Sequence, residues 1–226
     1  MKSVGAKALV ILSGGQDSTT CLYWALDKFG EGEVSTVTFD YGQRHRIEVE
    51  CAAAVAAAAG VEHACLPMNT FAALGGDALT DAMIDVDGNP DPATGLPNTF
   101  VPGRNLIFLT FAAAYAYPRQ IRHLVTGVAQ TDYSGYPDCR EATLKSLQTT
   151  IRLGMETDIV IHAPLMHRSK KDTVMLAREL GALPAMALTH TCYLGRRPPC
   201  GACSACRLRA KGFAEAGVDD PLLARE

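Results

Sequence analysis

The sequence predicts an α/β protein with a doubly wound, mostly parallel sheet and a small C-terminal helical zinc-knuckle module. Three features support this prediction. Short apolar runs alternate with helical patterns along most of the chain, a glycine turn follows the first apolar run, and cysteine, proline and arginine crowd together from about residue 184 onward. Strands that alternate with helices form parallel sheets with right-handed crossovers. We therefore expect a nucleotide-binding α/β domain at 1–183 and a zinc-binding module at 184–226.

Five segments are predicted to be strands and five longer ones to be helices. The apolar run at residues 8–12 is continuous, as expected for a strand covered on both faces. The other predicted strands are 34–39, 62–66, 123–128 and 159–163, and the helices are 19–29, 47–59, 105–117, 140–155 and 169–180. The helix at 169 opens with Ser-Lys-Lys-Asp, which resembles a capping box. A short last helix ends near Ala216.

One long segment interrupts the alternation. Residues 85–103 contain four prolines and three glycines and show no helical or strand pattern. Irregular loops of this length are usually functional lids or mobile connections. The sequence leaves both interpretations of this segment open.

Composition excludes several classes of protein. The 226 residues carry 21 Lys and Arg against 24 Asp and Glu, for a net charge of -3, which does not suit a general nucleic-acid coat. The first apolar run is shorter than a signal-peptide core, and the longest, residues 106–117, is too short to span a bilayer. We expect a cytoplasmic protein with no membrane partner and no direct nucleic-acid partner. The eight cysteines exceed what a chain of this size needs to fold.

The glycine turn Ser13-Gly14-Gly15-Gln16-Asp17-Ser18 lies between the first strand and its helix. Doubly wound sheets bind nucleotides at this point. Two glycines allow a close backbone approach, and the amides, the helix N-terminus and two serine hydroxyls form an anion site. The turn lacks the lysine of a Walker A loop and the spacing of dinucleotide binders. A Mg²⁺ bridge to phosphates would explain Asp17; the alternative is a helix start capped by Asp17 or Ser18.

This turn resembles the Ser-Gly-Gly-x-Asp-Ser loop of the PP-loop ATP pyrophosphatases, which implies ATP as cofactor and adenylation of a substrate. Asp40 ends the second strand, near where an acidic residue reaches a ribose hydroxyl. Arg44 and Arg46 follow it, and a solvated helix start is the alternative role for both. The predicted nucleotide-binding residues are Leu12, Ser13, Gly14, Gly15, Gln16, Asp17, Ser18, Thr19, Asp40 and Arg44.

Four cysteines near the C-terminus have the spacing of a metal site. Cys192, Cys200, Cys203 and Cys206 follow the pattern Cys-x7-Cys-x2-Cys-x2-Cys, with Pro198, Pro199 and Gly201 as turn residues. Four thiolates with no open position predict a structural Zn²⁺; an iron–sulfur cluster is the alternative. His190 is expected outside the ligand set, as a second-sphere or packed residue.

Five basic residues surround these cysteines, at positions 196, 197, 207, 209 and 211. Two roles fit them, contact with RNA or nucleotide phosphates and stabilisation of the thiolates. We favour the second.

A polar loop at residues 128–140 follows the fourth predicted strand. Carboxylates accept hydrogen bonds from a guanine-like edge, and tyrosines offer stacking faces, although an ordinary turn is the alternative. The predicted substrate-binding residues are Asp132, Tyr133, Ser134, Tyr136, Asp138 and Arg140. Cys139 suggests a glutaminase nucleophile, but a glutaminase needs a domain of its own, so free ammonia is the simpler donor. Cys21, Cys51 and Cys65 are expected to be core residues.

The motifs together resemble one family. Residues 13–21, 38–45, 98–105 and 134–140 and the four cysteines occur in the order seen in the QueC family of 7-cyano-7-deazaguanine synthases of queuosine biosynthesis. The resemblance spans roughly residues 7–213, with a modest departure at Ala129-Gln130. It implies an adenine nucleotide alpha-hydrolase-like fold, a homodimer, and zinc bound by the four cysteines. It also implies conversion of 7-carboxy-7-deazaguanine to the nitrile with ATP and ammonia.

In this hypothesis Asp17, Arg104 and Lys170 are the catalytic residues. Asp17 holds Mg²⁺ with ATP, and Arg104 and Lys170 neutralise phosphate charge while the substrate carboxylate is adenylated. Two other functions remain open, a PP-loop tRNA-modifying adenylase and a zinc-knuckle nucleic-acid-binding regulator. The net charge argues against both.

Overall fold

A five-stranded parallel sheet forms the centre of the molecule. The structure is a computed structural model that describes residues 7–43, 46–68, 70, 79, 94–130 and 136–225. The strands are β1 (Ala8–Ile11), β2 (Val34–Asp40), β3 (Glu62–Pro67), β4 (His123–Val125) and β5 (Val160–His162). Their order is β3-β2-β1-β4-β5, and every neighbouring pair is parallel. The doubly wound α/β prediction is confirmed.

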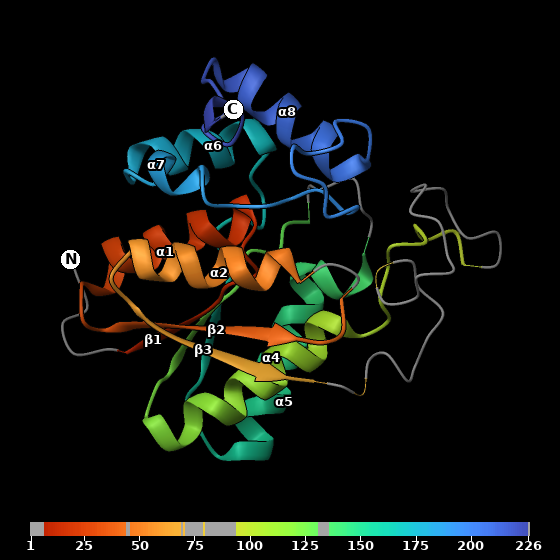
Figure 1. The fold of residues 1–226 in the computed structure, drawn as a ribbon. Helices are drawn as coiled ribbons and strands as arrows, with labels where there is room; N and C mark the ends of the chain where they lie inside the picture. Colours follow the sequence, from red (N-terminus) through yellow and green to blue (C-terminus); the bar gives the residue numbers. More distant parts are fainter. Residues whose placement is uncertain are drawn as a thin grey trace.

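Helices cover both faces of this sheet (Figure 1). α1 (Gln16–Phe29) and α2 (Ile47–Ala58) lie on one face, and α4 (Arg104–Ala116) and α5 (Glu141–Met155) lie on the other. Successive residues of β1 point to opposite faces of the sheet. Val10 belongs to the apolar cluster formed with α1 and α2, and Leu9 belongs to the cluster formed with α4 and α5. Both faces of β1 are therefore buried, which explains its continuous apolar sequence. α1 begins three residues earlier than expected, because the helix starts directly from the glycine turn.

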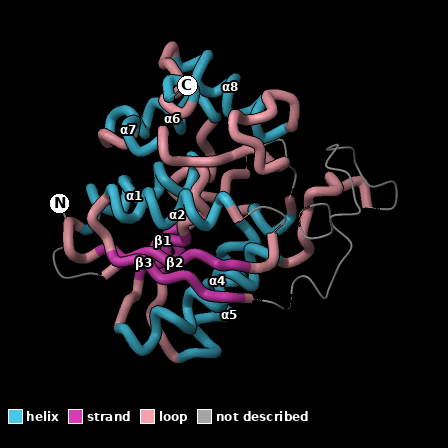
Figure 2. The backbone as a smooth tube through the Cα atoms, viewed as in Figure 1, coloured by secondary structure: helices cyan, strands magenta, loops and turns pink. Residues whose placement is uncertain are grey.

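Three further helices form a layer above α1 and α2 (Figures 1 and 2). They are α6 (Lys170–Glu179), α7 (Leu183–Met186) and α8 (Ser204–Ala216), of which the short α7 was not expected. The predicted capping box of α6 is present, with Ser169 and Asp172 exchanging hydrogen bonds. Val174, Met186 and Phe213 form a core between these helices. The domain division at 183/184 stays a prediction, and α6 packs on α8 across it.

The remaining turns include three short 3₁₀ helices, Tyr117–Arg119, Pro137–Cys139 and Leu223–Arg225. Of the long irregular segment 85–103, residues 85–93 lie outside the described part of the chain. Thr99 and Val101, from its second half, are buried.

The expectation for the three N-terminal cysteines is correct for two. Cys21 and Cys51 are buried, but Cys65 is exposed. β3 is an edge strand, so the side chains on one of its faces meet solvent. The prediction that Cys65 is a core residue is therefore wrong.

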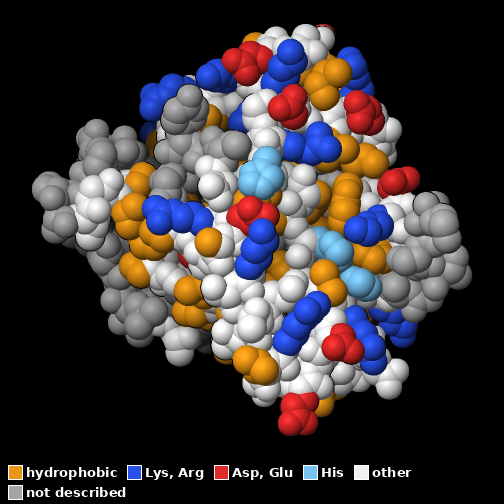
Figure 3. All heavy atoms as spheres, turned by 180° about the vertical axis from the view of Figure 1, so that it is seen from behind, with side chains coloured by type: hydrophobic (Ala, Val, Ile, Leu, Met, Phe, Trp, Pro, Cys, Tyr) orange, Lys and Arg blue, Asp and Glu red, His pale blue; other side chains and the backbone are white. Residues whose placement is uncertain are grey.

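Figure 3 shows one face of the surface, on which Lys and Arg side chains are scattered among Asp, Glu and apolar groups. They form no continuous basic area on the described part of that face. No helix in the described ranges has the length and hydropathy needed to cross a bilayer.

The topology places a crevice at the carboxyl ends of β1 and β4. The chain runs from β1 outward to β2 and β3, then returns to the other side of β1 as β4. Connections from these two neighbouring strands leave in opposite directions, which opens the sheet for a ligand at this switch point.

Candidate functional site

A cavity of about 300 Å³ lies at this switch point, at the lower end of the range usual for small-molecule sites. Its walls come from the turn after β1, residues 126–129 after β4, the start of α4, Lys170 at the start of α6, and residues 190–193 before the cysteine cluster. Segments from both ends of the chain thus meet at the cavity.

The glycine turn is held by its own side chains. The Ser18 hydroxyl accepts a hydrogen bond from the Ser13 N–H at 3.1 Å and lies 3.0 Å from the Ser13 hydroxyl. It also donates to the Gly15 carbonyl at 3.1 Å. The N-cap residue of α1 is Gly15, and no side chain caps the helix. The alternative of a helix start capped by Asp17 or Ser18 is therefore not what the structure shows, and anion binding by the first-turn amides of α1 stays a prediction.

Gly14 is required by close packing. Its φ is +82°, and a Cβ there would lie 2.2 Å from the Glu48 carbonyl oxygen. Only glycine allows α2 to approach the turn this closely. Gly127 performs the same role after β4, since a Cβ would lie 3.0 Å from the Ser18 nitrogen.

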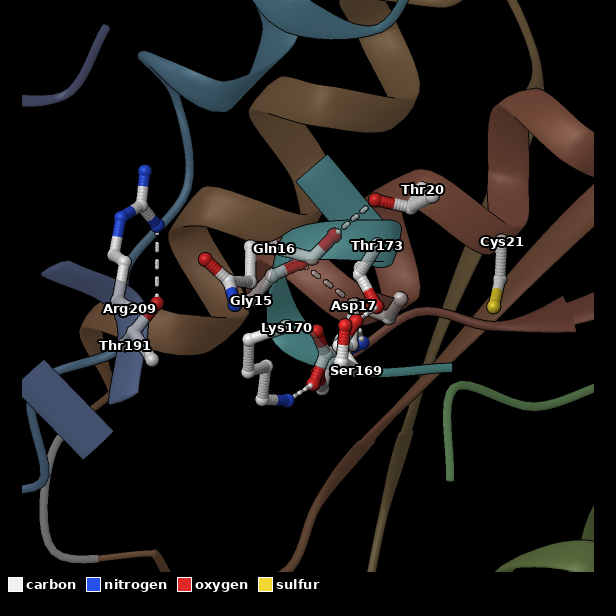
Figure 4. A network of polar contacts seen from close by, with 12 residues as sticks. Gly15, Gln16, Asp17, Thr20, Cys21, Ser169, Lys170, Thr173, Thr191 and Arg209 are labelled. Carbon is white, nitrogen blue, oxygen red and sulfur yellow. Dashed lines mark hydrogen bonds and ion pairs between the residues drawn. The ribbon is translucent and has the colours of Figure 1, made fainter. Parts of the chain in front are cut away.

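Asp17 and Lys170 form an ion pair at the cavity (Figure 4). The Lys170 ammonium lies 2.6 Å from Asp17 Oδ2, and their side chains are 13% and 26% exposed. This pair explains how a carboxylate is tolerated inside the predicted anion site. Asp17 Oδ1 is buried and has no hydrogen-bond partner among the described residues, so an acceptor remains for a cation.

The position of Lys170 depends on the C-terminal helix. A Cβ at Gly212 of α8 would lie 2.9 Å from Lys170 Cβ. Any larger residue at position 212 would move α8 away from the start of α6. Gly212 therefore fixes Lys170 relative to the glycine turn.

Arg104, the third predicted catalytic residue, also lines the cavity. It starts α4 directly after Gly103, whose φ of +72° turns the chain into the helix. Its guanidinium donates to the Tyr41 hydroxyl at 3.4 Å. The structure thus brings Asp17, Arg104 and Lys170 to one cavity, while their roles stay predictions.

The predicted nucleotide set is only partly gathered at the cavity. Leu12, Ser13, Gly15, Gln16, Asp17 and Ser18 line it. Gly14 packs on α2, and Thr19 donates to the Gly15 carbonyl at 2.9 Å. Asp40 does not line the cavity; its carboxylate pairs with Arg46 at 3.0 Å. Arg44 lies outside the described residues.

Most of the predicted substrate set cannot be placed at the cavity. Tyr136 lines it, with its hydroxyl 2.6 Å from that of Thr99. Asp138 is buried and accepts a hydrogen bond from the Asn105 N–H at 3.0 Å, so it caps α4 instead of facing a ligand. Arg140 is exposed and does not line the cavity. Asp132, Tyr133 and Ser134 lie outside the described residues.

The four C-terminal cysteines form a site of the right size for one metal ion. The sulfurs of Cys192, Cys200, Cys203 and Cys206 all lie within 4.8 Å of one another, and those of Cys200 and Cys206 are 3.9 Å apart. Tetrahedral Zn–S bonds of about 2.3 Å require sulfur separations of about 3.8 Å. Backbone N–H groups point at three of the sulfurs at 3.3–3.5 Å, as expected for thiolate ligands.

His190 connects this cluster to the glycine turn. It is buried, its N–H donates to the Gly14 carbonyl at 2.9 Å, and its Nε2 lies 3.2 Å from the Cys192 carbonyl oxygen. The expectation that His190 stands outside the ligand set agrees with this packing. The segment that carries the first cysteine is therefore attached to the glycine turn.

Arg209, which the sequence groups with the basic residues around the cysteines, is buried. Its side chain is 4% exposed and makes a two-pronged ion pair with Asp220, at 2.6 and 2.8 Å. It also donates to the hydroxyls of Thr189 and Thr191, the latter drawn in Figure 4. The guanidinium is occupied in positioning the segment next to His190.

Sequence reasoning gave no role to Glu48, Tyr41 and Tyr193, which line the cavity; Arg209, for which a role at the thiolates was favoured, lines it as well. Glu48 lies in the sequence Arg-Ile-Glu-Val-Glu, where alternating charges indicate an ordinary exposed helix start. The signal available was Gly14, because glycine is the residue that allows another part of the backbone to approach closely.

Comparison with known proteins identifies the family. The profile described as "Queuosine biosynthesis protein QueC" matches residues 7–217. The chain belongs to the QueC family. A relative from Laribacter hongkongensis, named 7-cyano-7-deazaguanine synthase, is 67% identical over 96% of this chain and 94% of its own. One of the same name from Chromobacterium violaceum is 66% identical over 97% and 94%. This QueC chain is thus close to its curated relatives over nearly its whole length.

Among solved structures, the U34-tRNA thiolase NcsA from Methanococcus maripaludis with its [4Fe-4S] cluster is similar to this QueC chain. The TM-score is 0.53, with 14% identity over 94% of this chain and 65% of the thiolase. At this identity the likeness concerns the fold alone, and it agrees with the nucleotide-binding α/β architecture.

Proposed function

We propose that this QueC protein is an ATP-dependent carbon–nitrogen ligase that converts 7-carboxy-7-deazaguanine and ammonia to 7-cyano-7-deazaguanine. The observation that carries the proposal is the cavity itself, in which an uncapped helix N-terminus, two serine hydroxyls, Lys170 and Arg104 surround one space. Relatives with 66–67% identity bear the name of this activity.

In this proposal each wall of the cavity has a role. The amides of the turn, Lys170 and Arg104 bind the phosphates of ATP, so that the substrate carboxylate attacks the α-phosphorus and pyrophosphate leaves. Ammonia then attacks the acyl adenylate, AMP leaves, and the product is the primary amide. Activation of the amide oxygen by a second adenylation, with loss of AMP and two protons, leaves the nitrile. Fixed charges and close positioning supply most of the acceleration.

Two metal ions fit the residues present. Asp17, with its unpartnered Oδ1, would hold Mg²⁺, which supplies charge neutralisation at the ATP phosphates. The four cysteines would hold a structural Zn²⁺, which contributes folding stability. An iron–sulfur cluster held by the four cysteines is the alternative, since the similar thiolase has a [4Fe-4S] cluster. Bound zinc without visible absorbance supports the zinc proposal, and iron with sulfide contradicts it.

The alternative of a tRNA-modifying adenylase is less well supported. Arg209 of the predicted basic group is buried and paired with Asp220, so it is not available to bind phosphates. A homodimer, a cytoplasmic location and the lack of a direct nucleic-acid partner stay predictions.

The test is a direct assay. The purified protein is incubated with ATP, ammonium and 7-carboxy-7-deazaguanine, and the products are followed by mass spectrometry. Nitrile and AMP are expected, and each control lacking one substrate should give no nitrile. Absence of nitrile together with modification of tRNA would overturn the proposal.

A further inference from the structure

Glu48 is the acidic residue of the cavity to which neither the sequence nor the comparisons give a role. Resting on the function proposed above, we infer that Glu48 forms the ammonium subsite: its carboxylate binds the ammonium ion and accepts the proton whose loss makes nitrogen nucleophilic. Three observations support this assignment: its position, its lack of a partner, and the charge of its surroundings.

The position of Glu48 follows from the packing of α2 on the glycine turn. Glu48 lies in the first turn of α2, and its own backbone is the group that Gly14 accommodates. Its side chain is half-buried and lines the same cavity as Ser13, Asp17 and Ser18. A ligand at Glu48 therefore stands next to the turn at which the acyl adenylate would form.

Glu48 differs from the other carboxylates near this site in having no partner. Asp17 is paired with Lys170, and Asp138 caps α4. Glu48 makes no side-chain hydrogen bond and no ion pair within the described part of the chain, although it is half-buried. A carboxylate in this situation requires either a proton or a cationic ligand.

The surroundings of Glu48 bring the pKa of its carboxyl close to neutral pH, where it can both accept and release a proton. Burial raises its pKa to about 7, and the charge of Arg104 opposes this rise only in part. Tyr193, which is half-buried, contributes a phenol on another wall of the cavity. A general base with a pKa near the working pH combines a useful ionised fraction with useful basicity.

The proposed step is balanced. Ammonium transfers one proton to the Glu48 carboxylate, which gives ammonia and the neutral acid. The ammonia lone pair forms the C–N bond at the acyl carbon, the bond from that carbon to the AMP oxygen breaks, and the second excess proton leaves for solvent. Glu48 then releases its proton to solvent before the second adenylation, a step that does not use ammonia.

Two other occupants of the Glu48 site would have different consequences. If Glu48 bound Mg²⁺, its loss would impair ATP use and adenylation. If it read the edge of the deazapurine, its loss would raise the KM for the carboxylic acid. An ammonium subsite predicts that both of these stay unchanged.

The experiment compares Glu48→Gln with Glu50→Gln, which alters an exposed carboxylate two residues further along the same helix. For Glu48→Gln we expect kcat/KM for ammonium to fall about 100-fold or more, the size of a general-base contribution. Exchange of labelled pyrophosphate into ATP, which depends on the carboxylic acid and not on ammonia, should remain within about twofold of the wild-type rate. Glu50→Gln should behave as wild type in both assays.

The rate of reaction with hydroxylamine distinguishes a general base from a residue that only supports the fold, because loss of a structural residue would slow this reaction as well. Hydroxylamine is mostly unprotonated near neutral pH and needs no base to release its lone pair. We expect Glu48→Gln to form the hydroxamate from the carboxylic acid at close to the wild-type rate.

Three results would overturn the assignment: unchanged kcat/KM for ammonium, equal losses in pyrophosphate exchange and in ammonium use, or a comparable loss with hydroxylamine. These outcomes are distinct from failure of the proposed function, in which the wild-type protein itself would form no nitrile.

Discussion

The four cysteine sulfurs come from 15 consecutive residues, 192–206, whereas the cavity collects side chains from Ile11 to Arg209. The cluster is a local structure, because short spacings and a tight turn bring its ligands together. The cavity depends on the whole fold, since its walls belong to two strands, five α-helices and the segment that precedes the knuckle. The two regions nevertheless share residues: His190 binds the glycine turn, and Cys192 follows two residues later. Metal binding in one region should thus support ligand binding in the other.

The largest effect is expected from Cys203→Ser, which removes one of four thiolates. Bound metal should be lost, and the free energy of unfolding should fall by several kcal/mol, part of the roughly 10–16 kcal/mol that zinc supplies in isolated fingers. ATP affinity should fall as well, because residues 190–193 line the cavity. Metal analysis, thermal unfolding and nucleotide titration measure the three effects.

Cys65→Ser is the matched control, since this thiol is exposed and lies outside the cluster. It should leave metal content and melting temperature unchanged. If Cys203→Ser lost metal yet kept full ATP affinity, the two regions would be independent.

The next effect is expected from Arg209→Met, which leaves Asp220 buried without its partner. Breaking a buried ion pair from one side costs about 3–5 kcal/mol, because an uncompensated charge remains. The hydroxyls of Thr189 and Thr191 also lose their donor, so the KM for ATP should rise. Chemical denaturation and steady-state kinetics test both parts.

A double variant, Arg209→Met with Asp220→Leu, should recover much of the stability but not the KM, because the apolar pair replaces the charges without binding the threonines. Lys211→Met, at an exposed residue of the same helix, should change stability by less than about 0.5 kcal/mol. Equal KM values in all variants would show that Arg209 supports the fold alone.

Asp17→Asn tests the cavity without disturbing the cluster. It removes the charge that faces Lys170 at 2.6 Å and the acceptor available to Mg²⁺. We expect kcat to fall at least about 100-fold, equivalent to about 2.7 kcal/mol, while metal content and melting temperature are retained. Asp27→Asn, at an exposed position of the same helix, should be neutral. Retained turnover in Asp17→Asn would exclude an essential role for this carboxylate.

The same contrast explains what the sequence could predict. The four cysteines and the Ser13–Ser18 turn were found because spacing and residue type express their chemistry within a few positions. Asp40 and Asp138 were expected to face ligands because they end strands or stand in a polar loop. Their actual partners, Arg46 and the Asn105 N–H, depend on how α2 and α4 pack.

Glu48 and Arg209 are the opposite case: both lie at the cavity, and the sequence did not predict it. Each resembles an ordinary charged residue of a solvated helix, and only the tertiary structure buries it. Gly14 and Gly212 show that close packing leaves a trace in the sequence, but a glycine does not say which residue approaches it.

The smallest effect is expected from a histidine pair on the sheet, away from both functional regions. His123 Nδ1 lies 3.0 Å from His162 Nε2, and Phe29 and Trp24 pack on the two rings. Burial, together with the charges of Lys28 and His123, lowers the pKa of His162 from 6.5 to about 4. Above pH 6.5 the ring is neutral in both states. Below it the unfolded chain binds the proton first, so stability falls until the pH reaches about 4.

The shift corresponds to about 3.4 kcal/mol at most, and exposure of part of the ring reduces the expected loss to about 1–2 kcal/mol. Unfolding free energies measured from pH 7 to pH 4 should show this decline, and His162→Gln should flatten it. His167→Gln, at an exposed histidine, should retain it. Because neither ring lines the cavity or belongs to the cysteine cluster, His162→Gln should keep its metal and its KM for ATP. If either value changed, a loss of stability elsewhere in the fold would be enough to affect metal and ATP binding. The connection between the two regions would then not depend on the shared segment at His190.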